Sequence, residues 1–330
     1  MPLPALPLPF TVLPSPSATH HHCVIPYASV GDDSCQHVLQ TLELPHLEQL
    51  LRTLAPSDVD LGEPDQPIPP HERAVARAWG LDAAQPAWAA CTTDLTEPCA
   101  WFTPCHWTAG ADQVRMDDPS ALVLDAEDAQ ALHRVLQPWF AEDGMQLTIV
   151  EPQRWCVSGA PVAQLMTASM DRVLLRDVSN WLPPTAAARR LQRLHSEVQM
   201  LLYDHGFNDA RAERGLSPIN AFWMHGAGQL SADALTQVRT QQAQVHLQVI
   251  DSLRQSALRQ DWVAWKAAWL AADAGPLTDL LHHVHAGGQA TLTLAGELHA
   301  RSFSTQPRSW TDKIRNLFSP QRFAGLHQAL

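Results

Sequence analysis

The sequence has almost no lysine, since Lys266 and Lys313 are the only two in 330 residues. Arginine supplies the other cations, and acidic residues outnumber basic ones by 34 to 22. A net charge of -12 argues against a nucleic-acid partner, because phosphate backbones bind basic faces. The sequence also lacks any run of eighteen apolar residues, so we expect no helix that spans a membrane.

Closely spaced cysteine pairs are also missing. The six cysteines are spread along the chain and form no CxxC motif, which excludes the dense disulfide framework of a small secreted domain. The N-terminal segment MPLPALPLPFTVLPSPS has no basic residue and is interrupted by proline, whereas a signal peptide needs a positive start and an unbroken apolar core. We therefore expect a cytoplasmic protein with reduced thiols.

Composition suggests three parts of the chain. Residues 1–19 are rich in proline and are predicted to form a flexible tail. Residues 20–160 are predicted to form an N-terminal α/β part, and residues 161–330 a C-terminal α/β part. The stretch PSDVDLGEPDQPIPP at 56–70 is the best candidate for an internal linker or long loop.

Patterns typical of strands alternate with patterns typical of helices. Strands are predicted at 21–29, within 99–125 and 145–159, at 219–226, and as a hairpin at 290–303. Helices are predicted at 35–54 with a break at Pro45, and at 72–81, 126–144, 186–204, 231–258, 260–272 and 276–285. This interleaving favours an α/β fold, with a mixed sheet and helices packed on it.

Two histidine motifs could bind a metal ion. The run HHHC occupies residues 20–23, but neighbouring residues of a strand point to opposite faces, so only alternate ones could share an ion. The alternative is a polar entry to the first strand. Asp279 and His283 have the DxxxH spacing of a metal site, on a predicted helix and without a companion motif.

Two further groups have a chemical and a structural interpretation. Cys99, Cys105 and His106 could supply zinc ligands or a Cys–His nucleophile, but their strand-like alternation favours buried cysteines that pack as small hydrophobes. The segment 168–184 alternates Arg and Asp at helical spacing, which is typical of ion pairs. Its arginines could also clamp a carboxylate or phosphate.

The stretch LLYDHGFNDARAERGLSPINAFWMHGAG, at 201–228, concentrates polar residues and glycines. A strand that ends in glycines just before a helix would offer free backbone N–H groups and a helix dipole to an anion. The candidate ligand-binding residues are His205, Asn208, Arg211, Asn220, His225, Gly226 and Gly228. In the alternative interpretation the glycines form a tight turn, and the two asparagines tie loops together.

Residues 195–228 resemble a bacterial family of RpfE-type regulatory proteins, whose members are often described as phosphoglycerate mutases. The stretches at 100–114, 138–147, 168–183 and 291–303 fit the same family. The segment is also similar to archaeal-type cofactor-independent phosphoglycerate mutases, at His205, Asn208, Arg211, Gly215, Pro218, Asn220 and 226–228. The mutase pattern has Pro in place of Gly206 and Arg in place of His225, and the lost Arg weakens a phosphate-binding role.

The resemblance implies a remnant of an alkaline-phosphatase-like fold. Such mutases need two metal ions, a nucleophilic Ser or Thr and several Asp and His ligands, and apart from the Asp279–His283 spacing no such clusters stand out in the sequence. We therefore expect a non-catalytic, cytoplasmic regulatory protein of RpfE type that binds a small anionic or phosphorylated ligand or a protein partner. The alternatives are a divergent metal-dependent phosphoglycerate mutase or phosphohydrolase, and a protein-interaction scaffold. We predict no cofactor, except a divalent metal under the enzyme alternative.

Overall fold

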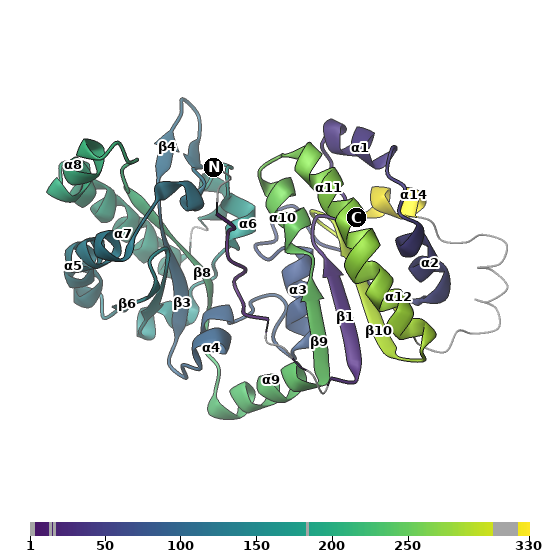
Figure 1. Cartoon of the computed structure of the whole chain (residues 1–330). Helices are drawn as coiled ribbons and strands as arrows, with labels where there is room; N and C mark the ends of the chain where they lie inside the picture. The colour runs from purple at the N-terminus through teal and green to yellow at the C-terminus, as the bar shows by residue number, and fades with distance from the viewer. Residues whose placement is uncertain (1–3, 13–14, 16–17, 183–184, 306–322) are drawn as a thin grey trace. The chain divides into compact units, whose positions relative to one another are not determined.

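The computed structural model describes residues 4–12, 15, 18–182, 185–305 and 323–330 (Figure 1). The chain forms two compact units. Unit 1 contains Met1–Thr11 and Ala84–Gln237, and unit 2 contains Val12–Ala83 and Val238–Leu330. Most of unit 1 is thus inserted between two halves of unit 2, whereas the composition predicts a division near residue 160. Local composition gives no sign of this insertion, because the two segments of unit 2 are brought together only by tertiary contacts.

Unit 2 is built on a five-stranded mixed sheet, with the strand order β2–β11–β10–β1–β9. The central strand β1 (His20–Ile25) pairs in parallel with β10 (Gln289–Ala295) and with β9 (Val245–Val249). The strand β11 (Ala300–Ser304) pairs antiparallel with β10 and with β2 (Ala55–Asp60). The carboxyl ends of β1, β9, β10 and β2 therefore share one edge of the sheet, which we call the carboxyl edge.

Helices accompany this sheet in unit 2. They are α1 (Asp33–Leu39), α2 (Pro45–Thr53), α3 (Pro70–Ala78), α10 (Asp251–Leu258), α11 (Trp262–Ala272), α12 (Thr278–His285) and the short α14 (Phe323–Leu326). Leu47, Leu50 and Leu51 form the buried face of α2, at the spacing of an amphipathic helix. A π-helical turn at Asp273–Leu277 joins α11 to α12. The Asp273 carboxylate accepts a hydrogen bond of 2.8 Å from the Leu47 amide and so fixes the start of α2.

Two strands of unit 2 differ from the sequence prediction. The structure has α9 (Ala232–Gln244), then β9, then α10, where the pattern predicts one helix over 231–258. The stretch predicted as a linker begins with β2, an edge strand whose side chains are mostly exposed. Both strands depend on partners more than 200 positions away, so their pairing overrides the local pattern.

Unit 1 contains a four-stranded antiparallel sheet with the order β6–β7–β3–β8. Its strands are β6 (Gln146–Glu151), β7 (Arg154–Ser158), β3 (Cys99–Cys105) and β8 (Ala221–Gly228), and β4 (Trp107–Ala109) pairs separately with β5 (Val114–Met116). Its helices are α4 (Trp88–Thr93), α5 (Ala126–Glu142), α6 (Met170–Val173), α7 (Ala186–Tyr203) and α8 (Gly206–Glu213). Every residue of β3 and β8 is buried, so these strands form the centre of the unit.

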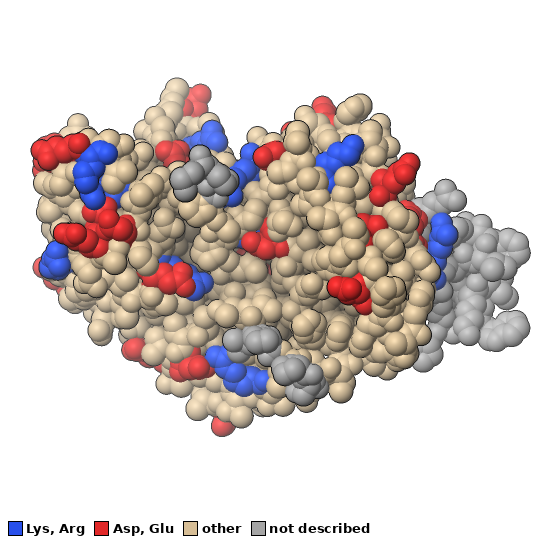
Figure 2. All heavy atoms as spheres, viewed as in Figure 1, with Lys and Arg blue, Asp and Glu red and all other residues tan. Residues whose placement is uncertain are grey.

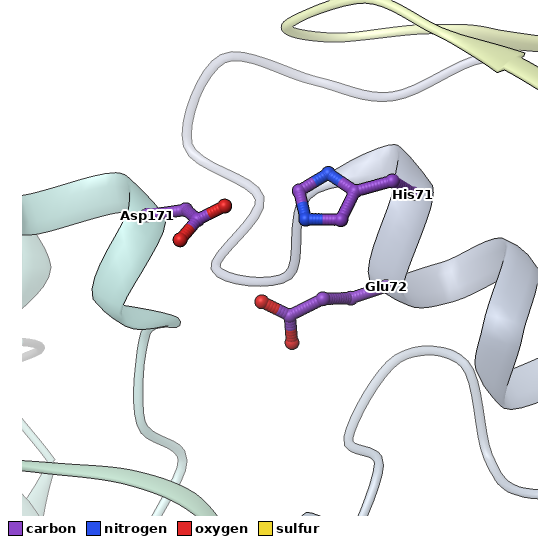
Figure 3. Close-up of side chains that lie close together, drawn as sticks. All are labelled: His71, Glu72 and Asp171. Atoms are coloured by element: carbon purple, nitrogen blue, oxygen red, sulfur yellow. The ribbon is translucent and has the colours of Figure 1, made fainter. Parts of the chain in front are cut away.

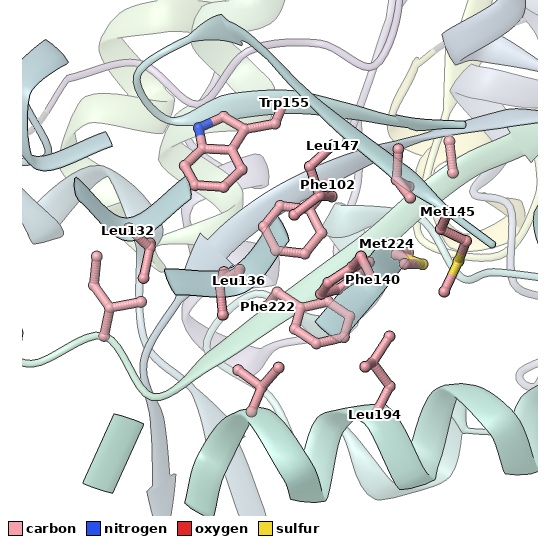
Figure 4. Close-up of a cluster of buried hydrophobic side chains, with 14 of the residues drawn as sticks. Phe102, Leu132, Leu136, Phe140, Met145, Leu147, Trp155, Leu194, Phe222 and Met224 are labelled. Atoms are coloured by element: carbon pink, nitrogen blue, oxygen red, sulfur yellow. The ribbon is translucent and has the colours of Figure 1, made fainter. Parts of the chain in front are cut away.

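Aromatic rings fill the core of unit 1 (Figure 4). Phe102 of β3 stacks on Trp155 of β7 at 5.3 Å and on Phe222 of β8 at 4.8 Å between ring centroids. Phe140 of α5 meets Phe102 and Phe222 edge-on, at 5.5 Å from each. Such edge and offset contacts add to the gain from burying these large side chains. The core thus joins α5 to three neighbouring strands.

The described part of the proline-rich N-terminal segment packs on unit 1. Leu6 and Phe10 are buried, and the Phe10 ring lies 4.7 Å from the ring of Trp88. The indole nitrogen of Trp101 donates a 2.7 Å hydrogen bond to the carbonyl oxygen of Pro9. Proline content predicts a flexible tail, but proline also favours an extended chain whose free carbonyls can accept such bonds.

The predicted fold class is confirmed, since the protein has a mixed α/β fold with helices packed on its sheets. The hairpin at 290–303 and the helices at 126–144 and 186–204 are also confirmed. In the described part of the chain, no helix has the length and apolar character needed to cross a membrane. On the face in Figure 2, acidic and basic side chains of the described residues are mixed in small groups.

Candidate functional site

Asn208 has structural partners for its whole amide. Its Nδ2 donates to the carbonyl oxygens of Leu202 at 2.8 Å and Ile219 at 2.9 Å, and its Oδ1 accepts from the Ile219 amide at 2.9 Å. The side chain is buried. Asn208 therefore ties the end of α7 and the start of α8 to the chain that leads into β8.

Arg211 is fully buried, and its guanidinium is surrounded by acceptors of the protein. Nε donates to the Ser217 carbonyl at 2.9 Å, and Nη1 donates to the Asp128 carboxylate at 2.9 Å. Nη2 donates to the carbonyl oxygen of Leu122. Arg214, which is 45% exposed, pairs with the same carboxylate at 2.6 Å. Arg211 thus clamps α8 onto the start of α5.

Asn220 and His205 also make local hydrogen bonds. Asn220 accepts from the Trp107 amide at 2.7 Å and donates to the Trp107 carbonyl at 2.9 Å, which connects the entry of β8 to β4. His205 precedes α8 and accepts from the Phe207 amide through Nδ1 at 3.1 Å, as a helix N-cap. His205 also lines an open groove of about 890 Å³ between α5, α7 and α8.

The two glycines lie inside strand β8, where the sequence predicts a turn after the strand. A Cβ atom at Gly226 would lie 2.9 Å from the Cβ of Trp88, and one at Gly228 would lie 2.6 Å from the Cβ of Ala87. The glycines therefore allow α4 and its preceding residue to approach β8 closely. His225, which precedes Gly226, is buried with Nε2 3.3 Å from the Thr103 hydroxyl.

Of the seven predicted ligand-binding residues, His205 alone lines the groove. The hydrogen bonds of Asn208, Arg211 and Asn220 go to protein groups, as the structural alternative expects. The geometry therefore favours a fold-holding role for these three residues. A ligand-binding role for the segment stays a prediction.

A second group of polar residues lies at the carboxyl edge of unit 2. Tyr27 and Ser29 follow β1, Asp251 follows β9, Glu297 follows β10, and Asp60 ends β2. In open sheets of this kind, ligands bind beyond the carboxyl ends of the parallel strands. This edge is therefore the first part of unit 2 in which to look for a ligand-binding site.

Hydrogen bonds connect the loops at the carboxyl edge. The amide of Gly31 donates to the Glu297 carboxylate at 3.1 Å, and Gln36 donates to the Ser29 hydroxyl at 3.3 Å. Tyr27 has a φ of 51°, in the left-handed region that few residues with a side chain adopt. Strained backbone is enriched at functional sites, but Asp94, Val123, Leu175 and Gln260 also have a positive φ, so Tyr27 alone does not identify a site.

The first turn of α3 adds two buried ionisable groups to this edge. His71 and Glu72 are 0% and 1% exposed, and a carboxylate oxygen of Glu72 lies within 4.8 Å of an imidazole nitrogen of His71 (Figure 3). The His71 ring centroid lies 5.6 Å from that of Tyr27. Asp171, also drawn in Figure 3, belongs to α6 of unit 1, where the Ser169 hydroxyl accepts from its amide.

Two buried arginines bring positive charge to the same edge. Arg73 donates to Asp60 through Nε and Nη2, at 2.9 and 2.8 Å, and its Nη1 donates to the Ile68 carbonyl. Arg254 is fully buried and donates to Asp251 at 2.9 Å. The positive charges are thus balanced by carboxylates at the ends of β2 and β9.

The chemistry available at the carboxyl edge follows from these groups. Burial raises the pKa of the Cys35 thiol to about 11, so this nearby cysteine is no thiolate nucleophile at neutral pH. His71 and Glu72 instead offer one nitrogen and one carboxylate donor, a combination suited to acid–base chemistry or to a divalent metal. The sequence prediction missed both residues, since PPHER at 69–73 signals only a helix that begins at a proline.

Comparisons with known proteins give weak likenesses. No protein-family model and no curated protein matches the sequence. A cofactor-independent phosphoglycerate mutase from Thermoplasma acidophilum is 14% identical over 87% of this chain and 89% of its own, with a TM-score of 0.35. The PH0037 protein from Pyrococcus horikoshii is 11% identical over 89% of both chains, with a TM-score of 0.43. Nothing about activity follows from them, and membership of the RpfE-type family stays a prediction.

Proposed function

We propose that this protein is a cytoplasmic regulatory protein of RpfE type that binds a small anionic ligand at the carboxyl edge of unit 2 without catalysis. The observation that carries the proposal is the concentration of buried ionisable side chains at that edge, above all His71 and Glu72. Burying charge rarely stabilises a fold, because desolvation offsets the attraction between the charges. Buried ionisable groups in a loop-lined edge are therefore candidates for function.

The anionic character of the ligand follows from the two arginines. Arg73 and Arg254 are buried and bonded to Asp60 and Asp251, so they would act on a ligand phosphate or carboxylate through their positive charge and not as open hydrogen-bond donors. The same carboxylates reduce the positive potential. We therefore expect a ligand with polar groups in addition to its phosphate or carboxylate, so that it also bonds to His71 or Ser29.

Calorimetric titration tests this proposal. The probes are inorganic phosphate and 3-phosphoglycerate, titrated into the full chain. Glu72→Gln keeps the side-chain shape, and His71→Ala removes the imidazole. We expect His71→Ala to weaken binding about tenfold, the effect of losing one hydrogen bond to a charged group, and Glu72→Gln to strengthen it, because the substitution removes a negative charge beside the anion. His37→Ala, on the exposed face of α1, is the matched control and should bind as the wild type does. Unchanged affinity in both edge variants would contradict the proposal.

The enzyme alternative has one observation in its favour, the closeness of His71 and Glu72. A mixed nitrogen and oxygen pair suits Mn²⁺ or Zn²⁺, and a divergent mutase or phosphohydrolase would need such ions. An assay of phosphoglycerate mutase activity with Mn²⁺, Mg²⁺ or Zn²⁺ separates the two functions. We expect no turnover above background, whereas turnover that disappears in Glu72→Gln would establish the alternative.

A further inference from the structure

Three histidines from different elements meet at the opposite edge of the unit 2 sheet, where the parallel strands begin. His21 of β1 lies opposite His246 of β9 in the parallel register, and their ring centroids are 4.8 Å apart. Helix α12 places His283 on the same face, where its ring stacks on that of His21 at 3.8 Å and 6°. Asp279 lies one helical turn before His283.

The strand alternation separates this cluster from the other histidines of the HHHC run. His20 and His22 lie on the other face of β1, where their Nε2 atoms are each 2.9 Å from the hydroxyls of Thr291 and Thr293. His21 alone therefore points to the face that carries His283. The Asp279–His283 pair has no companion motif near it in the sequence. In the folded chain, strands β1 and β9 bring two further histidines beside it.

The cluster borders a small cavity. A space of about 140 Å³ is lined by three of these residues, His21, His246 and Asp279, together with His22, Cys23, Gln248 and Leu280. His283 stacks on His21 but does not itself line this space. This volume exceeds the roughly 30 Å³ that one water occupies in the liquid, so it can hold an ion with a bound water. The cavity lies at the start of the strands, and the carboxyl edge lies at their ends.

The hydrogen bond of His283 leaves it in the form that a metal ligand needs. Its Nε2 lies 3.2 Å from the carbonyl oxygen of Gln289, and a carbonyl can only accept. A neutral His283 ring therefore carries its proton on Nε2 and offers the lone pair of Nδ1 to a metal. Histidine ligands of metals are commonly oriented in this way, by donating the other ring N–H to a backbone carbonyl.

We propose that His21, His246, His283 and Asp279 form a binding site for one transition-metal ion, such as Zn²⁺. Three imidazoles and a carboxylate match the donor types and the number of ligands of a tetrahedral zinc site. No three of these four residues have their donor atoms within 4.8 Å of one another in the described chain, and the rings of His21 and His283 lie face to face, so side chains turn about their torsions when the ion binds. The half-buried position of His283 on α12 permits this movement.

Metal titration of the untagged full chain tests the site. Zn²⁺ is titrated by calorimetry, and Co²⁺ by visible absorption, whose intensity reports a tetrahedral site. We expect one equivalent of metal to bind, and His283→Ala and His246→Ala each to weaken binding about tenfold or more. His282→Ala is the matched control on the exposed side of α12 and should leave the affinity unchanged.

Two results would overturn the proposal. The first is a wild-type chain that binds neither metal at micromolar concentration, or that binds equally well in His283→Ala, His246→Ala and His282→Ala. The second is a bound metal that is lost in Glu72→Gln but retained in His283→Ala, which would place the ion at the carboxyl edge. Circular dichroism of each variant shows that a lost site is not a lost fold.

Discussion

The two units of this chain use their polar side chains in different ways. Unit 1 encloses Arg211 and Asn208 in hydrogen bonds that join helices to strand β8, over an aromatic core. Unit 2 instead places ionisable groups at both edges of a mixed sheet, with His71 and Glu72 at one and His21 among the histidines at the other. Buried polar groups thus bond the elements of unit 1 to one another, whereas the candidate sites of unit 2 combine the buried His71 and Glu72 with histidines that are only partly buried.

The mutase-like segment lies in unit 1, whereas both candidate sites lie in unit 2. The polar side chains of residues 201–228 hold a helix against a strand in this chain. The DARAERG turn shows this, because Arg211 bonds to the Ser217 and Leu122 carbonyls and to Asp128. We therefore predict that substitutions of the buried polar residues of unit 1 lower the free energy of unfolding. Substitutions at the two edges of the unit 2 sheet should instead change the affinity for an anionic ligand or a metal ion.

The largest expected effect is that of Arg211→Ala. The substitution leaves backbone carbonyls and part of the Asp128 carboxylate buried without their partner. Breaking a buried pair from one side costs about 3 to 5 kcal/mol of the free energy of unfolding. Urea denaturation measures this loss. Arg214→Ala is the control, because this exposed partner of the same carboxylate contributes about 1 kcal/mol or less.

The Arg211→Ala variant can also contradict the contrast between a structural role in unit 1 and ligand binding in unit 2. If Arg211→Ala folds with the stability of the wild type but loses affinity for inorganic phosphate, the segment is a ligand site and unit 1 is not merely structural. Phosphate titration of the folded variant distinguishes these outcomes. Unchanged phosphate binding together with the loss of stability would support the fold-holding role.

Local patterns were sufficient to predict most helices and the central strands. The amphipathic spacing at 186–204 and the alternation within 99–125 both correspond to elements of the structure. The pattern failed at β9, because QAQVHLQVI continues a helix-like run and becomes a strand only through pairing with β1. The insertion of unit 1 into unit 2 was likewise invisible, since no local composition marks positions 83 and 238.

The candidate sites could be predicted only in fragments. The HHHC run and the Asp279–His283 spacing are both visible in the sequence, but 255 residues lie between Cys23 and Asp279. Only the sheet register shows that His21 is the histidine that faces α12. His71 gave no signal at all, because its importance comes from burial at the end of a parallel sheet.

The second prediction concerns the N-terminal segment of unit 1. Deletion of residues 1–11 removes the buried side chains of Leu6 and Phe10 and the acceptor for Trp101. Burying two such side chains stabilises by about 2 to 3 kcal/mol each, and ordering the segment offsets part of that gain. We expect a net loss of about 2 to 4 kcal/mol, measured by urea denaturation.

A substitution within the full chain is the control for this deletion. Phe10→Ala should reproduce much of the loss, because it removes the ring contact with Trp88. Thr11→Ala changes an exposed residue of the same segment and should have little effect. If the deletion leaves the free energy of unfolding unchanged, the segment is a flexible tail, as the sequence predicts. It would then not belong to the packed structure of unit 1.

The smallest expected effect is the response to acid, in which the two units should behave alike. Burial lowers the pKa of His195 in unit 1 to about 3, and burial lowers the pKa of His22 in unit 2 to about 4. The unfolded chain binds these protons near the ordinary histidine pKa of about 6.5. The contribution of each neutral histidine is therefore fully present above pH 6.5 and is lost as the pH falls towards the folded value. At pH 5 the loss is about 2 kcal/mol for each histidine.

The variant His195→Gln isolates the unit 1 share of this acid response. Glutamine does not titrate in this range, and its amide can donate to the Phe222 carbonyl, which lies 3.1 Å from Nε2 of His195. The difference in the free energy of unfolding between pH 7.5 and pH 5 should therefore shrink by about 2 kcal/mol in His195→Gln. His37→Gln, at an exposed position, should keep the full difference. If His195→Gln also keeps it, His195 already titrates near its ordinary pKa in the folded chain, and the acid response comes from His22 and other groups.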